Sequence, residues 1–279
     1  MAYRKANLQQ VQKLYLSMFK KLDLFLEKKN IDYFAVGGTL LGTYRHQGFI
    51  PWDNDMDLGM TRDNYNRFIK VARELEKEGD FTLIGNPFTH YCEHGLIRVA
   101  FNGTEQANLN YKKKIDRRLA IDIFPFDMIS NDKKKNSKIW KKIKRIKWML
   151  DIKAREKSLK VIKNIGLKVF QFALSPITFK HLQLKMDRLA TSSNKQPNLT
   201  RITNYYGAYS IERETTLFEI INKTSRLQFA DTTIKCPIRA KEYLENVYGK
   251  NFMQPADIRF DVNSYYCYVE ENTFEAYCK

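Results

Sequence analysis

The chain has 279 residues, 43% of them hydrophobic, and a formal net charge of +17. This length allows one sizeable domain or two small ones with a buried core, and the hydrophobic fraction is ordinary for a globular protein. Residues 1–20 lack the apolar segment of a secretory signal, and no run of about 18 apolar residues occurs, so we expect neither a signal peptide nor a membrane-spanning helix.

The first half of the chain has the apolar spacing of alternating helices and strands. Residues 7–29 have helical spacing, and residues 33–36 form a short apolar strand that leads into Gly37-Gly38. The further elements that we predict are a helix from 40–44, a strand at 56–60, a helix at 63–78, and strands at 81–84, 95–102 and 119–124. This order predicts an α/β fold with a mixed sheet flanked by helices.

Residues 131–195 change character and combine lysines with apolar residues at helical spacing. The apolar positions include Trp140, Ile143, Ile146, Trp148, Ile162, Ile165 and Val169. We predict a basic helical insertion whose apolar stripe packs on the core, with a helix boundary at Pro176. A second interpretation puts Trp140, Trp148 and the lysines at a lipid interface.

The charge is concentrated in one segment. Residues 112–195 hold 24 Lys and Arg and 7 Asp and Glu, an excess of 17 that equals the net charge of the whole chain. Such a segment suits a polyanion or an anionic surface: nucleic acid, a phosphorylated glycan or an anionic inner leaflet. The simpler alternative is a solvated helical face.

The cysteines predict no disulfide framework. Cys92, Cys236, Cys267 and Cys278 are widely spaced and form no CxxC unit, so we expect free thiols in a reducing cytosol. The spacing of His90, Cys92 and His94 could suit zinc on a strand, but only three ligands are present. We therefore favour a plain strand or loop at this position.

The densest chemical signal is a glycine turn followed by alternating carboxylates. Gly37-Gly38-Thr39 can bring backbone N–H groups close to a phosphate, because no Cβ intervenes at the glycines. If a strand begins at Asp55, Asp55 and Asp57 point to one face, where their repulsion favours a divalent cation. The pattern indicates metal-dependent phosphoryl or nucleotidyl transfer. A solvated acidic loop is the alternative; the calcium-loop pattern is not matched.

Three segments carry a family resemblance. Residues 36–60 closely resemble the signature of the LicD family, and residues 121–127 and 243–255 fit the same family in the expected order. LicD proteins belong to the nucleotidyltransferase superfamily, so the resemblance implies a nucleotidyltransferase-like sheet. It also implies that Asp55, Asp57 and Asp122 are the catalytic and metal-binding residues, with Mg²⁺ or Mn²⁺ as cofactor. Asn54 departs from the family's usual aspartate, and on a strand it would point away from the metal pair.

The resemblance also implies a reaction: transfer of phosphocholine from CDP-choline to a sugar hydroxyl of a bacterial cell-surface glycan, of lipopolysaccharide or teichoic acid type, with release of CMP. The substrate-binding candidates are Gly37, Gly38, Thr39, Arg45, His46, Trp52 and Asp53. Arg45 could bind a phosphate oxygen, and Trp52 could stack on a base or line a head-group pocket. Tyr205, Tyr206 and Tyr209 are the candidates for an aromatic cage around choline.

With the resemblance, we predict three parts of the chain: a catalytic core with an N-terminal helix (1–130), the basic insertion (131–200) and a C-terminal part that completes the catalytic domain (201–279). We expect a cytoplasmic protein, with residues 112–195 as a candidate contact to the inner face of the cytoplasmic membrane. The alternatives are transfer of another CDP-activated alcohol phosphate, or a nucleotidyltransferase acting on a small molecule. A nucleic-acid-binding protein would not need the Asp55–Asp57 spacing, so no nucleic acid partner is expected.

Overall fold

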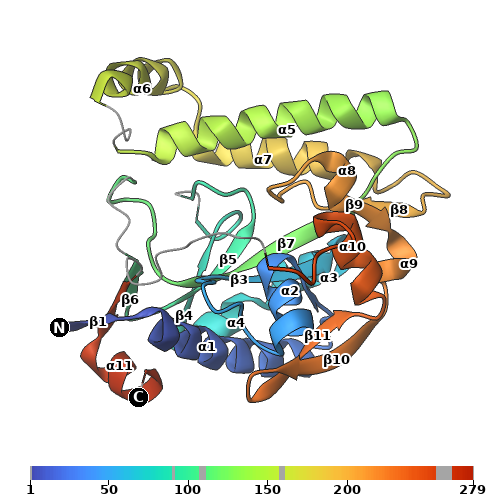
Figure 1. The fold of residues 1–279 in the computed structure, drawn as a ribbon. Coiled ribbons are helices and arrows are strands. Elements are labelled where there is room, and N and C mark those ends of the chain that lie inside the picture. Colours follow the sequence, from blue (N-terminus) through green and yellow to red (C-terminus); the bar gives the residue numbers. More distant parts are fainter. Residues whose placement is uncertain (1, 90–91, 107–110, 157–160, 256–265, 279) are drawn as a thin grey trace.

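The computed structural model describes residues 2–89, 92–106, 111–156, 161–255 and 266–278. Its main sheet has the strand order β2-β3-β7-β5-β4 (Figure 1). These strands are β2 (Phe34–Ala35), β3 (Met56–Thr61), β7 (Ala120–Met128), β5 (Ile97–Phe101) and β4 (Phe81–Ile84). β3 and β7 are parallel, whereas the other neighbours along this path are antiparallel. The predicted mixed α/β sheet is confirmed.

The helices of the first half lie where the apolar spacing predicts them, with one difference. They are α1 (Leu8–Lys28), α2 (Gly37–His46), α3 (Arg62–Val71) and α4 (Arg73–Glu76). α1 begins at a capping box, in which the side chains of Asn7 and Gln10 each accept the other's backbone N–H at 3.0 Å. The helix predicted at 63–78 is confirmed over most of its length, but it is divided at Ala72, where a turn places a 3.0 Å hydrogen bond from Leu75 N–H to Ala72 O, and it ends at Glu76.

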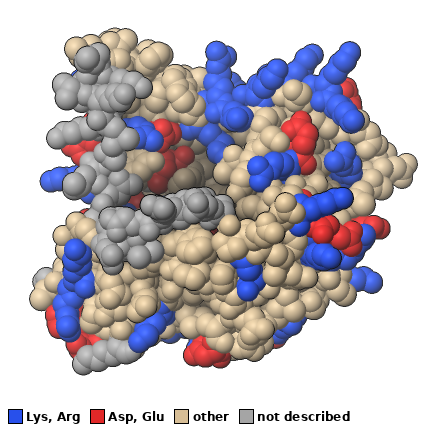
Figure 2. Space-filling model, in the orientation of Figure 1, with Lys and Arg blue, Asp and Glu red and all other residues tan. Residues whose placement is uncertain are grey.

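The predicted basic insertion is helical, and its first and last helices pack together. It consists of α5 (Lys133–Ala154), α6 (Val161–Ala173), α7 (Phe179–Ala190) and a 3-10 turn at Thr191–Ser193. α5 lies along α7, and Lys and Arg side chains crowd the outer edge of the molecule over α5 (Figures 1 and 2). Pro176 lies between α6 and α7, as predicted.

The apolar stripe predicted for the insertion divides into two parts. Trp140, Ile143 and Ile146 are buried in a second hydrophobic cluster with α7, so the core-packing prediction is confirmed for these three positions of α5 and the interface placement of Trp140 is wrong. Trp148 of the same helix is exposed, so core packing is wrong for it. Ile165 and Val169 of α6 are instead exposed, and there the prediction is wrong. The reason is that α6 contacts the rest of the insertion through another of its faces, as described below.

The C-terminal part extends the same sheet. β8 (Arg201–Thr203) pairs antiparallel with the end of β7, and β9 (Thr215–Leu217) pairs with β8. The remaining elements of this part are α8 (Ile211–Glu214), α9 (Phe218–Ile221), the hairpin of β10 (Thr224–Phe229) and β11 (Thr232–Pro237), and α10 (Ala240–Tyr248). The tip of the hairpin is joined to the end of α2, where Ala230 N–H bonds to Gln47 O at 2.6 Å.

A small sheet brings the two ends of the chain together. Its strand order is β1 (Tyr3–Ala6), β12 (Cys267–Glu270) and β6 (Thr104–Gln106), and both pairings are antiparallel. α11 (Glu271–Tyr277) follows β12, and Arg4 forms ion pairs with Glu271 and Glu275 of that helix. The N and C labels of Figure 1 therefore lie at the same corner of the molecule.

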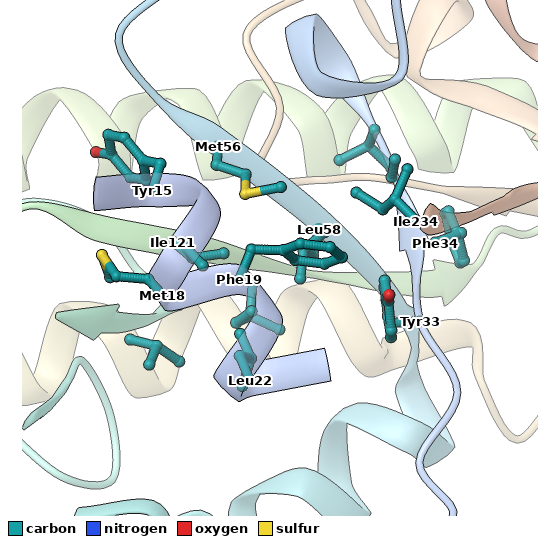
Figure 3. Packing of buried hydrophobic residues seen from close by; sticks show 14 of the residues in the cluster. Tyr15, Met18, Phe19, Leu22, Tyr33, Phe34, Met56, Leu58, Ile121 and Ile234 are labelled. Carbon is teal, nitrogen blue, oxygen red and sulfur yellow. The ribbon is translucent and has the colours of Figure 1, made fainter. Parts of the chain in front are cut away.

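The main hydrophobic core lies between α1 and the strands of the large sheet (Figure 3). Phe19 of α1 is fully buried and meets the rings of Tyr33 and Phe229 edge-on, at centroid distances of 6.2 and 6.3 Å. Replacing such a side chain with alanine removes about 3–5 kcal/mol of stability. This packing fixes α1 against the sheet, and α1 in turn supports the site described below.

A buried ion-pair network connects the insertion to the sheet. Arg62, the first residue of α3, donates two hydrogen bonds to the Asp127 carboxylate of β7, at 2.7 and 2.6 Å. A third bond, of 2.9 Å, reaches Asp187 of α7, and Asn194 donates to Asp127 at 2.7 Å. The Asp127 side chain is 0% exposed. We call these four residues the Arg62 network.

The four cysteines are free and buried, which confirms the prediction of free thiols. Burial raises the pKa of Cys92, Cys236 and Cys267 to about 12 and that of Cys278 to about 11. Within the described residues, no helix combines the length and the apolar character needed to cross a bilayer.

Candidate functional site

The centre of the site is a row of charged side chains across three neighbouring strands. Asp57 of β3 lies opposite Asp122 of β7 in the parallel register, and Arg98 of β5 lies opposite Asp122 in the antiparallel register. Residues paired in this way share a face of the sheet. Arg98 Nε donates to Asp122 Oδ1 at 2.7 Å. The sheet therefore brings together the second and third acids of the sequence pattern.

Two further carboxylates reach the same place from the loop before β3. Asp55 directly precedes β3, which begins at Met56 as the predicted strand 56–60 does. Asp53 is held by its backbone: its N–H bonds to Ile50 O at 2.9 Å, and its carbonyl accepts a 2.9 Å bond from Gln12 of α1. Gln12 also donates to Ile50 O at 3.2 Å, so α1 fixes this loop from below.

The carboxylates perturb one another's ionisation. Burial raises the pKa of Asp57 well above its ordinary value, and the charges of Asp55, Asp122 and Asp53 raise it further. Burial and the neighbouring Asp55 likewise raise the pKa of Asp53. Asp55 stays accessible to solvent, yet the cavity walls displace part of its hydration, and this raises its pKa too. The positive charge of Arg98 opposes the shifts at Asp55 and Asp57 only in part.

The glycine turn at the start of α2 packs directly against these carboxylates. Gly37 has φ of +56°, and a Cβ placed on it would lie 2.8 Å from Asp57 Oδ2. A Cβ on Gly38 would collide with Asp53 Oδ2. Glycine is therefore required for the carboxylates to sit beside the first N–H groups of α2, which favour anions.

Thr39 lies behind the cavity lining and does not contact the cavity as the two glycines do. It is buried, and its hydroxyl accepts the Asp57 backbone N–H at 2.8 Å and does not line the cavity. Val36 N–H bonds to Asp57 O at 3.2 Å, so two hydrogen bonds fasten the glycine turn to β3. Thr39 thus positions Asp57.

Arg45 and His46 lie at the far end of α2, outside the cavity. An α-helix rises 1.5 Å per residue, so the ten residues of α2 separate its ends by about 15 Å. Arg45 donates to Phe252 O at 3.3 Å and to His46 Nε2 at 2.9 Å. The structure does not bring these two residues together with the carboxylates.

The carboxylates line a cavity of about 790 Å³, in the range of small-molecule sites. Figure 2 shows it as a hollow with acidic side chains in its depth. Its polar lining residues from the first half of the chain are Asp53, Asn54, Asp55, Asp57, His94 and Asp122. The insertion contributes Lys147, and the C-terminal part contributes Asn204, Tyr206, Tyr209, Glu214, Tyr243 and Tyr248. All three parts of the chain therefore form the cavity.

We call the aromatic side chains that line this cavity the aromatic wall. Trp52, Tyr206, Tyr209, Tyr243 and Tyr248 all belong to it, and the rings of Tyr209 and Tyr248 meet edge-on at 5.6 Å. Of the cage candidates, Tyr206 and Tyr209 lie at the cavity, but Tyr205 does not. Tyr205 is buried instead against Trp140 of the insertion, with a centroid distance of 6.3 Å.

Lys147 and Glu214 order the loop that carries Tyr206 and Tyr209, and the sequence analysis missed both. Lys147 Nζ donates to the carbonyls of Tyr206 and Gly207, at 2.9 and 2.7 Å. The buried Glu214 carboxylate accepts the Tyr209 N–H at 3.0 Å. Lys147 shares its segment with many solvated lysines, so nothing in the sequence separates it from them.

Arg98 is the third residue that the sequence analysis missed, and here a signal exists. It is the one charged residue in the apolar strand 96–101. A charge inside a buried strand needs a partner of opposite sign, and Asp122 supplies it. His94 was considered for zinc with Cys92 and His90. His94 lines the cavity 3.3 Å from Glu93, Cys92 is buried, and His90 lies outside the described residues.

The donor set suits a hard divalent cation such as Mg²⁺ or Mn²⁺. Carboxylate oxygens are the ligands that these ions prefer, and the mutual repulsion of the aspartates would be relieved by a cation. Within the described residues, no group of three or more His, Cys, Asp and Glu side chains has the arrangement of a metal site. Mg²⁺ is commonly bound by one or two carboxylates together with substrate phosphates, so an open set of this kind fits it.

A glycine turn against paired aspartates, with a third aspartate on the neighbouring strand, is the arrangement that the family resemblance implies for a nucleotidyltransferase-type domain. Comparison with known families agrees: residues 30–160 match the family described as LicD/FKTN/FKRP, nucleotidyltransferase domain. Residues 30–160 are therefore similar to the nucleotidyltransferase domain of the LicD family.

Three relatives are similar to parts of the chain. The Haemophilus influenzae protein named lipopolysaccharide cholinephosphotransferase LicD is 29% identical over 181 residues, which span 64% of this chain and 66% of the relative. Uncharacterized proteins of Rickettsia prowazekii and Rickettsia typhi are 36% and 35% identical over 80 and 79 residues. Each of these matches covers 25% of this chain, and 30% and 26% of the two relatives. The chain thus matches less than two thirds of the length of each relative.

Proposed function

We propose that this protein is a metal-dependent transferase that moves phosphocholine from CDP-choline to a sugar hydroxyl of a cell-surface glycan and releases CMP. The observation that carries the proposal is the pairing of Asp57 with Asp122 beside the Gly37-Gly38 turn. The choice of phosphocholine rests on the printed name of the Haemophilus influenzae relative.

In this proposal the acceptor oxygen forms a bond to the phosphorus of phosphocholine, and the bond from that phosphorus to the CMP oxygen breaks. Asp55, Asp57 and Asp122 would hold a divalent ion, which when bound neutralises the diphosphate and the leaving CMP. The N–H groups at Gly37 and Gly38 would bind phosphate oxygens. The hydroxyl proton passes to a carboxylate of this set, for which Asp122 is the candidate.

The aromatic wall is the candidate site for the choline group. A quaternary ammonium is attracted to the faces of tyrosine and tryptophan rings, and Trp52, Tyr209 and Tyr248 offer such rings in one cavity with the carboxylates. The ordering of Tyr209 by Glu214 would fix the wall before substrate binds.

The test is release of CMP from CDP-choline by the purified protein with a glycan precursor, in the presence of Mg²⁺ or of EDTA. Asp57→Asn should lower turnover at least about a hundredfold, because it removes an anionic ligand of the divalent ion that would neutralise the diphosphate. Asp63→Asn, the same change at an exposed position on α3, is the matched control and should leave turnover unchanged.

The products distinguish the alternatives. Phosphocholine on the glycan and free CMP, both dependent on Mg²⁺, support the proposal. If CMP is released only from another CDP-activated alcohol, that alcohol and not choline is the transferred group. A product that retains the nucleotide would mean nucleotidyl transfer. Near-normal turnover of Asp57→Asn would refute the assigned site.

A further inference from the structure

Helix α6 presents apolar side chains to solvent. Ile165, Val169, Phe170 and Phe172 are 73%, 61%, 50% and 82% exposed. Trp148 of α5 is 47% exposed, and its ring meets that of Phe170 edge-on at 5.4 Å. We call these five residues the α6 patch. Contiguous exposed apolar surface of this kind marks an interaction site more often than chance.

The outward orientation of the α6 patch is fixed by contacts on the opposite side of the helix. Leu167 and Leu174 are buried with Ile152 of α5. Gln171 donates to Ile152 O and to Arg155 O at 2.8 and 2.7 Å, and Lys153 donates to Leu174 O at 2.8 Å. Because α6 already buries one apolar side, its other side is available to a partner.

A row of basic side chains continues the α6 patch along α5. Lys134, Lys138, Lys141 and Arg145 are exposed and recur every three or four residues, so they share the helix face that ends in Trp148. Residues 133–150 contain no Asp or Glu. Figure 2 shows Lys and Arg side chains along this edge and an uncharged surface over α6. We call these four residues the basic stripe.

We propose that the α6 patch and the basic stripe together dock onto an anionic membrane surface. Apolar and aromatic side chains enter the headgroup boundary, while lysines beside them are attracted to anionic lipids. Two copies meeting through this face would bring two basic stripes together, which disfavours self-association. The patch also exposes Ile165 and Val169, aliphatic side chains that cannot stack on nucleic acid bases but are readily buried among lipid chains.

The proposal is independent of the proposed reaction, but it has a geometric consequence for it. α5 carries the basic stripe on its outer side and Lys147 at the cavity. A helix with its side chains is about 10 Å across, so the docked face would lie about one helix diameter from the cavity wall. A substrate presented at a membrane surface would therefore be within reach of the site.

The test is flotation of the full chain with vesicles of equal parts phosphatidylcholine and phosphatidylglycerol, compared with phosphatidylcholine alone. We expect binding to the anionic vesicles and weakening by salt. Val169→Ser with Phe172→Ser should lower binding, and Leu24→Ser, an equally exposed leucine on α1, should not. Lys138→Gln and Lys141→Gln should each weaken binding about fivefold, whereas Lys70→Gln on α3 should not.

Three outcomes would overturn the proposal: no binding to anionic vesicles, equal binding to both vesicle types, or binding that the α5 and α6 variants leave unchanged. A dimer in sedimentation that Phe172→Ser dissociates, without any vesicle binding, would assign the α6 patch to a second copy instead. Circular dichroism of each variant, compared with the wild type, separates lost binding from lost folding.

Discussion

Removing Arg62 should destabilise the protein strongly, because it leaves the Asp127 carboxylate buried without its cation. Asp127 is 0% exposed and receives two of the three hydrogen bonds that Arg62 donates to carboxylates. The third partner, Asp187, is 40% exposed, so that pair adds little. We therefore attribute the effect of Arg62→Met to Asp127 alone, and breaking one partner of a buried pair costs about 3–5 kcal/mol.

The assay is urea unfolding followed by far-ultraviolet circular dichroism. Arg62→Met should lower the free energy of unfolding by that amount, a large part of the about 5–15 kcal/mol of a typical domain. Arg67→Met, the same change at an exposed position of the same helix, should lower it by less than about 1 kcal/mol.

A second substitution tests the reason for the loss. Adding Asp127→Asn to Arg62→Met removes the unpaired buried charge and should recover part of the lost stability. A loss below about 1 kcal/mol for Arg62→Met, or a double variant less stable than the single one, would refute the reasoning about a buried unpaired charge.

Two further predictions concern the site. Gly37→Ala should reduce turnover, because the added Cβ would crowd Asp57. The control is Gly79→Ala, also at positive φ but with open space around it, which should lower stability by about 1–2 kcal/mol and leave turnover intact. Equal turnover in both variants would contradict this. Since the pKa of Asp57 is raised in the folded state, the metal-free wild type should lose stability relative to Asp57→Asn as the pH rises from the ordinary carboxyl range. Thermal unfolding of both proteins in EDTA and in Mg²⁺ checks this. The melting temperature of Asp57→Asn minus that of the wild type should increase with pH in EDTA, and it should be smaller in Mg²⁺. A difference that decreases with pH in EDTA would contradict the prediction.

The main sheet and the helices of the first half could be predicted because their apolar spacing is local. The β1–β12–β6 sheet could not, since it pairs Tyr3 with Glu270 and each strand is short. Nothing in a four-residue segment specifies a partner that lies more than two hundred residues away. The β10–β11 hairpin was missed for another reason: its turn includes Ala230 at φ of +51°, where a glycine or asparagine signal would be expected.

For the candidate site, closeness in sequence predicted correctly which residues of a strand lie at the cavity, but it failed for residues of a helix. The spacing of Asp55 and Asp57 predicted that both lie at one site, and both line the cavity, whereas Asp122 followed from the family resemblance. Arg45 is close in sequence to the glycine turn, but a helix carries it away from the site. Lys147 and Glu214 come from distant segments, and their contacts depend on how the insertion packs on the sheet. Such contacts follow from tertiary packing, which local spacing does not report.

The burial of all four thiols makes this chain a suitable background for spectroscopic labelling. A maleimide reacts with an accessible thiolate, and both burial and the raised pKa values suppress that form in the native cysteines. A single introduced thiol, for instance by Phe172→Cys, could then carry an environment-sensitive fluorophore without removal of any native cysteine. The emission of that fluorophore would report the polarity around α6 directly, in solution and beside vesicles.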